Sequence, residues 1–127
     1  LGKLKDANFQ RKKLTLRYRD NFKGTNIRIP FDNTSKNHLS AFHILPALLP
    51  SKANRSDVME NLKTDGIQTS IHYPPFWNFS AYKGFFEKEL TPIAADLIPR
   101  ELTLPLYPTM TIEEVDEVSS LLILSCK

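Results

Sequence analysis

The first segment of the chain carries apolar side chains at helical spacing. Leu14, Tyr18 and Phe22 follow one another every four residues, and Gly24 comes shortly after them. This repeat predicts a helix from Leu4 to Phe22 that stops at the glycine. The apolar stripe is narrow and many other positions are charged, so we expect the helix to pack on another element, inside or outside this chain.

Two later segments show the two-residue period of β-strands. Residues 39–47 are largely apolar in both phases, which predicts a strand covered on both faces, with Pro46 at an edge or a bulge. Residues 67–73 alternate between the two faces, which predicts a strand with one buried face. Two prolines end this second strand directly after His72 and Tyr73, because proline has no backbone N–H to donate.

Capping signals mark three further helices. Asn54 is suited to cap a short helix that Gly66 closes in the left-handed conformation. Thr91 precedes a proline, a usual opening for a helix with proline at its first position. Thr111 and Glu114 form a capping box before the apolar stripe of the last helix. With a short extended piece ahead of that helix, these elements predict an α/β or α+β domain.

Composition narrows the class of protein. The chain has 127 residues and one cysteine, Cys126, so an internal disulfide is excluded and a reducing compartment, the cytoplasm, is favoured. The length fits one domain or a piece of a larger protein. The chain has a net charge of +3, and its basic excess lies in the first 24 residues, which we interpret as a solvated helix face. We expect neither nucleic acid nor a membrane as partner, since the sequence has no docking motif and no apolar run of about 18 residues.

A search for self-contained chemistry finds little. The sequence has no glycine-rich phosphate loop, no nucleophile elbow and no histidine pair at the helix spacing of metal ligands. His38 and His43 lie on one predicted strand but face opposite sides, so they predict no shared metal site. His72 is favoured by position, because it ends a strand beside Tyr73 and the aromatic segment 74–90. That segment fits either a hydrophobic cluster under a long loop or a wall of a binding cleft or interface.

The order of the motifs resembles that of one enzyme family. The chain carries, in sequence, Arg11 and Tyr18 in its first helix, His-Ile-Leu-Pro-Ala-Leu-Leu from His43, a helix from Arg55 through Leu62 to Gly66 and Ile67, His-Tyr-Pro-Pro from His72, Tyr82, Leu-Thr-Leu-Pro-Leu-Tyr-Pro from Leu102, and Thr-x-x-Glu-Val from Thr111. In this order the motifs resemble the C-terminal part of the DegT/DnrJ/EryC1/StrS family of PLP-dependent sugar aminotransferases of fold type I. The resemblance covers essentially the whole chain.

This resemblance implies a small, mostly antiparallel sheet of about three strands with helices packed on it, as in the C-terminal small domain of these enzymes. Residues 1–24 would be a helix linking to a large N-terminal domain, and residues 25–127 the small domain. The complete enzyme would be a homodimer that binds PLP and aminates a nucleotide-linked keto-sugar, with glutamate as donor, for surface polysaccharide or secondary metabolite biosynthesis. The Schiff-base lysine of the family belongs to the large domain, so the resemblance implies a chain that holds neither PLP nor catalytic residues and is inactive alone.

The resemblance also indicates which residues reach the substrate cleft. His72 and Tyr73 are candidates for substrate binding, because an imidazole and a phenol can each donate a hydrogen bond to a sugar hydroxyl or a diphosphate oxygen. Trp77 departs from the family, in which many members have a histidine at the corresponding place. Its indole is a candidate stacking surface for a sugar ring or a base. Lysines such as Lys83 match no Schiff-base motif and are interpreted as solvated.

Two other functions fit the same features. One is a stand-alone interaction module, with the aromatic segment 74–90 as partner surface and the basic first helix as its rim. The other is a regulatory relative that keeps the fold without the chemistry. The residues encoded before Leu1 separate the possibilities, since a PLP lysine there supports an aminotransferase and a start codon beside Leu1 supports a module.

Overall fold

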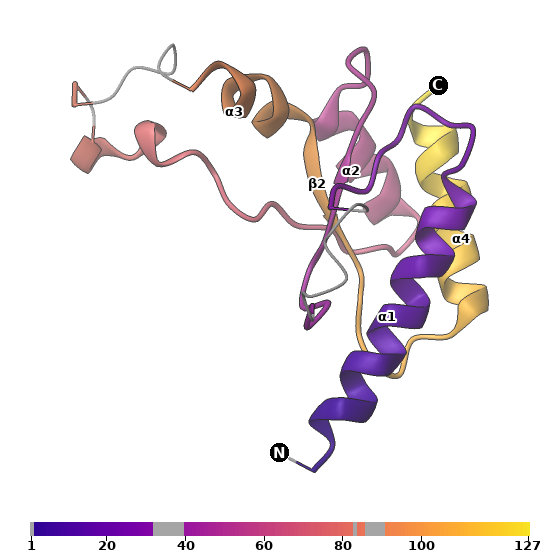
Figure 1. The fold of residues 1–127 in the computed structure, drawn as a ribbon. Helices are drawn as coiled ribbons and strands as arrows, with labels where there is room; N and C mark the ends of the chain where they lie inside the picture. The colour runs from indigo at the N-terminus through magenta and orange to yellow at the C-terminus, as the bar shows by residue number, and fades with distance from the viewer. Residues whose placement is uncertain (1, 32–39, 83, 86–90) are drawn as a thin grey trace.

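The computed structural model describes residues 2–31, 40–82, 84–85 and 91–127. Helices and two short strands alternate along the chain, with 3₁₀ turns between them (Figure 1). The elements are α1 (Leu4–Asn21), β1 (Leu45–Leu48), α2 (Arg55–Thr64), η1 (Phe76–Asn78), η2 (Ser80–Tyr82), α3 (Pro92–Leu97), η4 (Ile98–Arg100), β2 (Glu101–Leu104) and α4 (Ile112–Ser125). Within the described ranges, no helix has the length and apolar character needed to cross a membrane.

Helix α1 packs on α4, and the two helices run in the same direction (Figure 1). The side chains that recur every four residues, Leu14, Tyr18 and Phe22, are buried in the core. On the solvent side of the contact, the Arg17 guanidinium donates two hydrogen bonds to the Asp116 carboxylate, each 2.7 Å long. The predicted first helix is therefore confirmed, and it has a partner inside this chain.

The strands β1 and β2 form an antiparallel pair in which Leu45 lies opposite Leu104 and Ala47 lies opposite Leu102. Because side chains alternate across a strand, these four point to the same face. All four are buried and join the core built by α1, α2 and α4. The predicted α+β class is confirmed, but the sheet has two strands rather than about three.

Each strand has one additional backbone pair on its outer edge. Arg28 and Leu48 exchange hydrogen bonds of 3.0 and 2.8 Å, and Ser70 and Thr103 exchange hydrogen bonds of 3.2 and 2.8 Å. The order across the sheet is therefore residue 28, β1, β2 and residue 70. These single pairs hold two irregular segments against the strands.

The strand predicted over residues 67–73 is wrong, because only one residue of this segment pairs with β2, at Thr103. The backbone groups of Glu101 and Pro105 point in the same direction as those of Thr103, since the direction repeats every two residues. Pro105 has no N–H to donate. The Glu101 carbonyl accepts a hydrogen bond from Arg55 Nη1 at 3.1 Å. The ladder therefore stops after one pair.

The strand predicted over residues 39–47 is shorter than expected, because β1 begins at Leu45. Phe42 has a φ of 49°, in the left-handed region, which a strand cannot include. Leu39 lies outside the described residues. Pro46 stands on an edge strand, as predicted. Its backbone nitrogen faces away from β2, so the missing N–H costs no hydrogen bond between the two strands.

The capping signals predicted for α2 and α4 are confirmed, whereas Thr91 stands at the N-cap position of α3 without a side-chain capping bond. The Asn54 side chain accepts a hydrogen bond from Ser56 N at 2.9 Å at the start of α2. Gly66 has a φ of 79° just beyond the end of that helix. Thr111 and Glu114 form a reciprocal capping box, with hydrogen bonds of 3.1 and 2.7 Å. Helix α3 has a proline in its first turn, as the sequence indicated.

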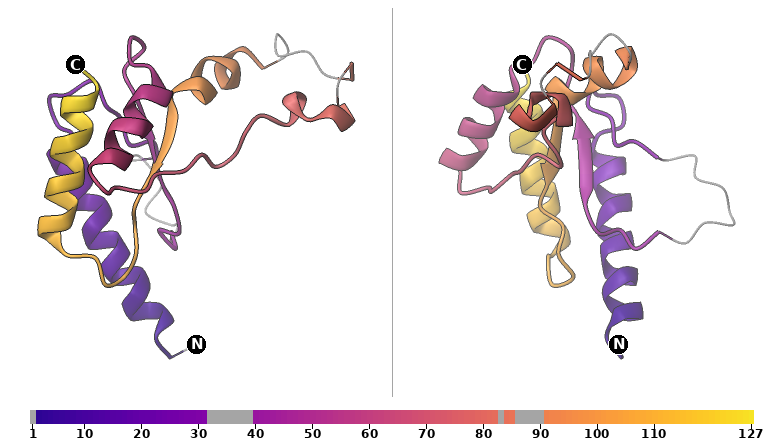
Figure 2. Two further views of the ribbon diagram at one scale, coloured as in Figure 1. Left: turned by 180° about the vertical axis from the view of Figure 1, so that it is seen from behind. Right: turned by 90° about the vertical axis from the view of Figure 1, so that its left-hand side faces the viewer.

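The segment that carries the 3₁₀ turns η1 and η2 runs away from the packed helices in the three views (Figures 1 and 2). It begins just after the backbone pair at Ser70 and leads toward α3, which also lies apart from α1 and α4. The buried core and the residues packed against it include no described aromatic residue of this segment.

Candidate functional site

His72 lies beside two hydroxyl groups. Its Nδ1 atom is 3.0 Å from Thr103 Oγ1 and 3.3 Å from Ser70 Oγ. Thr103 Oγ1 donates a hydrogen bond to Glu101 Oε1 at 2.8 Å. We call Ser70, His72, Glu101 and Thr103 the polar cluster. It is a continuous chain of hydrogen bonds from a carboxylate to an imidazole.

The alternation of β2 explains why the polar cluster forms. Leu102 and Leu104 point into the core, so Glu101 and Thr103 point to the opposite face of the sheet. The backbone pair at Thr103 holds the neighbouring segment against β2, and this brings His72 alongside. Thr103 is buried, whereas His72 and Glu101 are half-buried. The cluster is therefore fixed on its strand side and open on its imidazole side.

The structure keeps two of the three sequence candidates together. Tyr73 is 76% exposed, and its ring contacts that of His72 edge-on, with centroids 5.0 Å apart. Trp77 instead contacts Phe76, with centroids 5.3 Å apart. Phe76 also contacts Tyr82 at 5.8 Å. Trp77 therefore belongs to a separate ring group on the projecting segment.

Much of the aromatic surface of residues 74–90 is exposed. Phe79 and Tyr82 are about half exposed, and Phe85 is 84% exposed. Phe86 lies outside the described residues. Exposed apolar area of this kind is typical of a surface that another protein segment or a ligand covers. The segment forms a small ring group of its own rather than packing on the main core.

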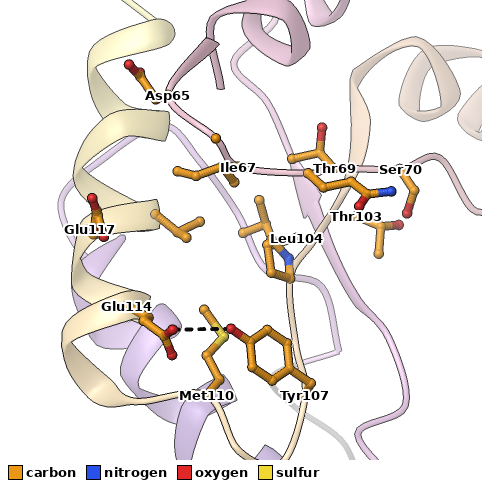
Figure 3. Close-up of a pocket in the computed structure, with 14 residues that line it drawn as sticks. Asp65, Ile67, Thr69, Ser70, Thr103, Leu104, Tyr107, Met110, Glu114 and Glu117 are labelled. Carbon is orange, nitrogen blue, oxygen red and sulfur yellow. Dashed lines mark hydrogen bonds between the residues drawn. The ribbon is translucent and has the colours of Figure 1, made fainter. Parts of the chain in front are cut away.

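A pocket of about 500 Å³ opens beside the polar cluster. Ser70 and Thr103 lie on one side of it, and α4 with Glu114 and Glu117 lies on the other (Figure 3). Tyr107 Oη donates a hydrogen bond to Glu114 Oε1 at 3.4 Å. Partial burial, followed by the charge of this carboxylate, raises the pKa of Tyr107. The walls come from separate segments, so no sequence motif indicated this pocket.

Sequence reasoning missed Glu101 and Thr103 as members of the site. The available signal was Thr103 itself, a polar residue between leucines in a short apolar strand. His43 is exposed and lies just before β1. His38 and Lys83 lie outside the described residues. In the described part of the chain, no group of His, Cys, Asp or Glu side chains could hold a metal ion.

All lysines in the described residues have exposed side chains. They are Lys3, Lys5, Lys12, Lys13, Lys23, Lys52, Lys63 and Lys127. Two arginines have structural roles instead. Arg55 Nη1 donates to the Ile98 and Glu101 carbonyls at 2.5 and 3.1 Å, and Arg100 Nη1 donates to the Leu49 carbonyl at 3.2 Å. These bonds tie α2 and β1 to the start of β2.

Solved structures that share this fold include a putative sugar aminotransferase. The apo form of a putative sugar aminotransferase from Streptococcus pneumoniae superposes on 99% of the chain with a TM-score of 0.89 and 25% sequence identity. The same protein is known in a PLP form, with a TM-score of 0.87. The chain covers 32% of the apo structure and 33% of the PLP form.

Sequence comparison gives the family. Residues 1–122 match the DegT/DnrJ/EryC1/StrS aminotransferase family, and the chain belongs to it. It is 32% identical over 125 residues to the spore coat polysaccharide biosynthesis protein SpsC of Bacillus subtilis, covering 93% of the chain and 32% of that protein. It is 27% identical over 124 residues to the UDP-4-amino-4,6-dideoxy-N-acetyl-beta-L-altrosamine transaminase of Helicobacter pylori, covering 94% and 33%. The chain thus spans about a third of these relatives, and the family indicated by its motif order is confirmed.

Proposed function

We propose that the chain is the C-terminal part of a PLP-dependent aminotransferase acting on a nucleotide-linked keto-sugar. The observation that carries this proposal is a family match along nearly the whole chain, in a chain about one third as long as its relatives. Residues 1–24 are then the linking helix and residues 25–127 the small domain. Leu4, Phe9 and Leu16, which α1 leaves about half exposed, support a contact with a large N-terminal domain.

His72 and Tyr73 are proposed to contribute to one wall of the substrate cleft. The two hydrogen bonds that the structure gives for the His72 ring both go to Nδ1, and the half-buried ring offers Nε2 as the proposed ligand contact. The Tyr73 side chain is exposed beside it. An imidazole and a phenol can both hydrogen-bond to sugar hydroxyls. Trp77 is proposed to offer its indole face to a sugar ring or a base.

The cofactor is assigned to the missing part of the enzyme. A Schiff base with PLP needs a lysine amine directed into a site that shields it from water. Each lysine of the described residues is exposed at the surface, so these described residues do not fit this cofactor. The chain alone is therefore expected to be inactive, and no step of the reaction is derived from its residues.

The remaining parts of the proposal follow from the relatives. The two relatives act in spore coat polysaccharide biosynthesis and in transamination of a UDP-linked amino sugar, and this supports a nucleotide-sugar substrate and a role in surface polysaccharide or secondary metabolite biosynthesis. Glutamate is the proposed amino donor, and a cytoplasmic homodimer is the proposed assembly.

The test compares two polypeptides. One is the 127-residue chain, and the other is the same chain extended by the residues that its reading frame encodes before Leu1. Each is incubated with PLP, reduced with borohydride and analysed by mass spectrometry, and each is assayed with glutamate and a UDP-linked keto-hexose. We expect a trapped PLP adduct and amino-sugar formation with the extended polypeptide alone.

Two results would contradict the proposal. One is a PLP adduct on the 127-residue chain together with transamination by that chain. The other is an extended reading frame that encodes no trappable lysine. In an active extended enzyme, His72→Ala should raise KM for the sugar substrate more than His43→Ala, because His43 lies outside the polar cluster.

The exposed aromatic segment favours one alternative, a stand-alone interaction module. Tyr82 and Phe85 are exposed on a segment that projects from the core, and such a surface can bind another protein. A start codon next to Leu1 would support this alternative. So would a binding partner that is lost when Phe79, Tyr82 and Phe85 are changed together to serine while far-UV circular dichroism stays the same.

A further inference from the structure

The hydrogen atoms of the polar cluster can be placed by counting donors. An ionised carboxylate only accepts hydrogen bonds, and a threonine hydroxyl has one hydrogen to give. Thr103 uses that hydrogen in its 2.8 Å bond to Glu101 Oε1. At the 3.0 Å contact between Thr103 Oγ1 and His72 Nδ1, the oxygen must therefore accept. The hydrogen of this contact belongs to the imidazole.

We infer that Glu101 and Thr103 are positioning residues that hold neutral His72 in the tautomer with hydrogen on Nδ1 and a lone pair on Nε2. Ser70 Oγ, at 3.3 Å from the same nitrogen, can accept a second share of that hydrogen but is the longer contact. The backbone supports this geometry, since Ser70 and Thr103 are joined by two main-chain hydrogen bonds. Figure 3 shows these two side chains next to each other at the side of the pocket formed by β2.

This tautomer changes the kind of ligand that His72 can recognise. With Nε2 as an acceptor, neutral His72 binds a hydrogen-bond donor, such as a sugar hydroxyl or an amino group. It has no hydrogen to offer to a diphosphate oxygen, which was the second partner expected from the sequence. The substrate half of this inference rests on the proposed function, whereas the tautomer itself does not.

The tautomer can be measured on the nitrogen-15-labelled 127-residue chain. Protonated and unprotonated ring nitrogens have well-separated nitrogen-15 shifts, and long-range proton–nitrogen spectra assign Nδ1 and Nε2. His72→Gln identifies the resonances of His72 among those of the three histidines. The spectra are recorded at a pH where they show the imidazole to be neutral. We expect a protonated Nδ1 and an unprotonated Nε2.

Variants test which group sets the tautomer. Thr103→Val removes the acceptor at nearly constant volume and should give a mixture of both tautomers, whereas Thr103→Ser should restore the single form. Ser70→Ala is the matched control and should keep the wild-type pattern. A wild-type spectrum with hydrogen on Nε2 overturns the inference. This test uses the wild-type chain, so it does not depend on whether the variants fold. A Thr103→Val spectrum identical to wild type overturns the role of Thr103.

The substrate half is tested in the extended enzyme. Losing one oriented hydrogen bond is worth roughly a threefold to tenfold rise in KM for the keto-sugar, so Thr103→Val should show this rise and Thr103→Ser should not. An unchanged KM together with a changed tautomer overturns contact between His72 and a sugar donor, and leaves the tautomer result standing. An extended polypeptide without any transaminase activity refutes the proposed function, and the spectra then decide the inference alone.

Discussion

Tyr18 tests whether α1 belongs to the fold of this chain. The side chain is fully buried, and its hydroxyl donates a hydrogen bond to the Pro105 carbonyl at 3.1 Å. Burial raises the pKa of Tyr18 well above its usual value, so the hydroxyl keeps its hydrogen. Tyr18→Phe retains the ring, which stacks near Phe22 with centroids 6.1 Å apart, and removes only this bond. It leaves the Pro105 carbonyl without its donor.

The expected loss is about 1–2 kcal/mol of the free energy of unfolding, because a hydrogen bond contributes about 1 kcal/mol and an unpaired, partly buried carbonyl costs somewhat more. For a chain of this size, that loss lowers Tm by roughly 3–8 °C. Urea unfolding followed by far-UV circular dichroism measures it. Tryptophan fluorescence is less suitable, since Trp77 lies on the projecting segment and reports poorly on the core.

Tyr107→Phe is the matched control for this experiment. Its hydroxyl makes a longer bond, 3.4 Å to Glu114, on an exposed side chain, so we expect a change below about 0.5 kcal/mol. If both variants unfold at the same urea concentration as the wild type, then α1 does not pack on β2 and α4 in the isolated chain. The packing of the first helix would then depend on a partner from outside.

Three further predictions concern local features. Gly66→Ala should lower the free energy of unfolding, measured in urea, by about 1 kcal/mol, because an alanine is strained at a φ of 79°. A new Cβ would meet no atom within 4 Å, so this backbone strain is the whole expected effect, and an unchanged stability would contradict the left-handed backbone. Thr111→Ala should also cost about 1 kcal/mol by removing the cap that Thr111 and Glu114 form, and Thr111→Ser should recover most of it. Asp116→Asn should destabilise the chain at neutral pH, because hydrogen bonds from Arg17 and then Asn21 lower the pKa of Asp116 to about 2. A lowered pKa stabilises the folded state above the unfolded value of about 3.9, so the difference between variant and wild type should disappear as the pH falls from about 4 to about 2.

Local signals in the sequence predicted the ends of helices well. Asn54, Gly66 and the capping box at Thr111 each act through atoms a few residues away, so the sequence contains everything that their geometry requires. The four-residue repeat was also enough to predict α1, because the apolar stripe of a helix can be buried against any apolar surface. These features were predictable because neighbouring residues determine them.

Residues 67–73 could not be predicted in the same way, because a strand requires a second strand with free backbone groups. The two-residue alternation of this segment is that of a strand, but on β2 only the backbone N–H and C=O of Thr103 pair with it. Pairing stops on either side of Thr103, because Pro105 has no N–H and the Glu101 carbonyl is bound by the Arg55 guanidinium. These residues are distant from residue 70 in the sequence, so the local pattern could not reveal them. The one pair that does form, between Ser70 and Thr103, still holds the segment against β2 and brings the His72 imidazole beside the Thr103 hydroxyl. The alternation therefore placed His72 correctly at the edge of the sheet, although it did not predict how short the pairing is.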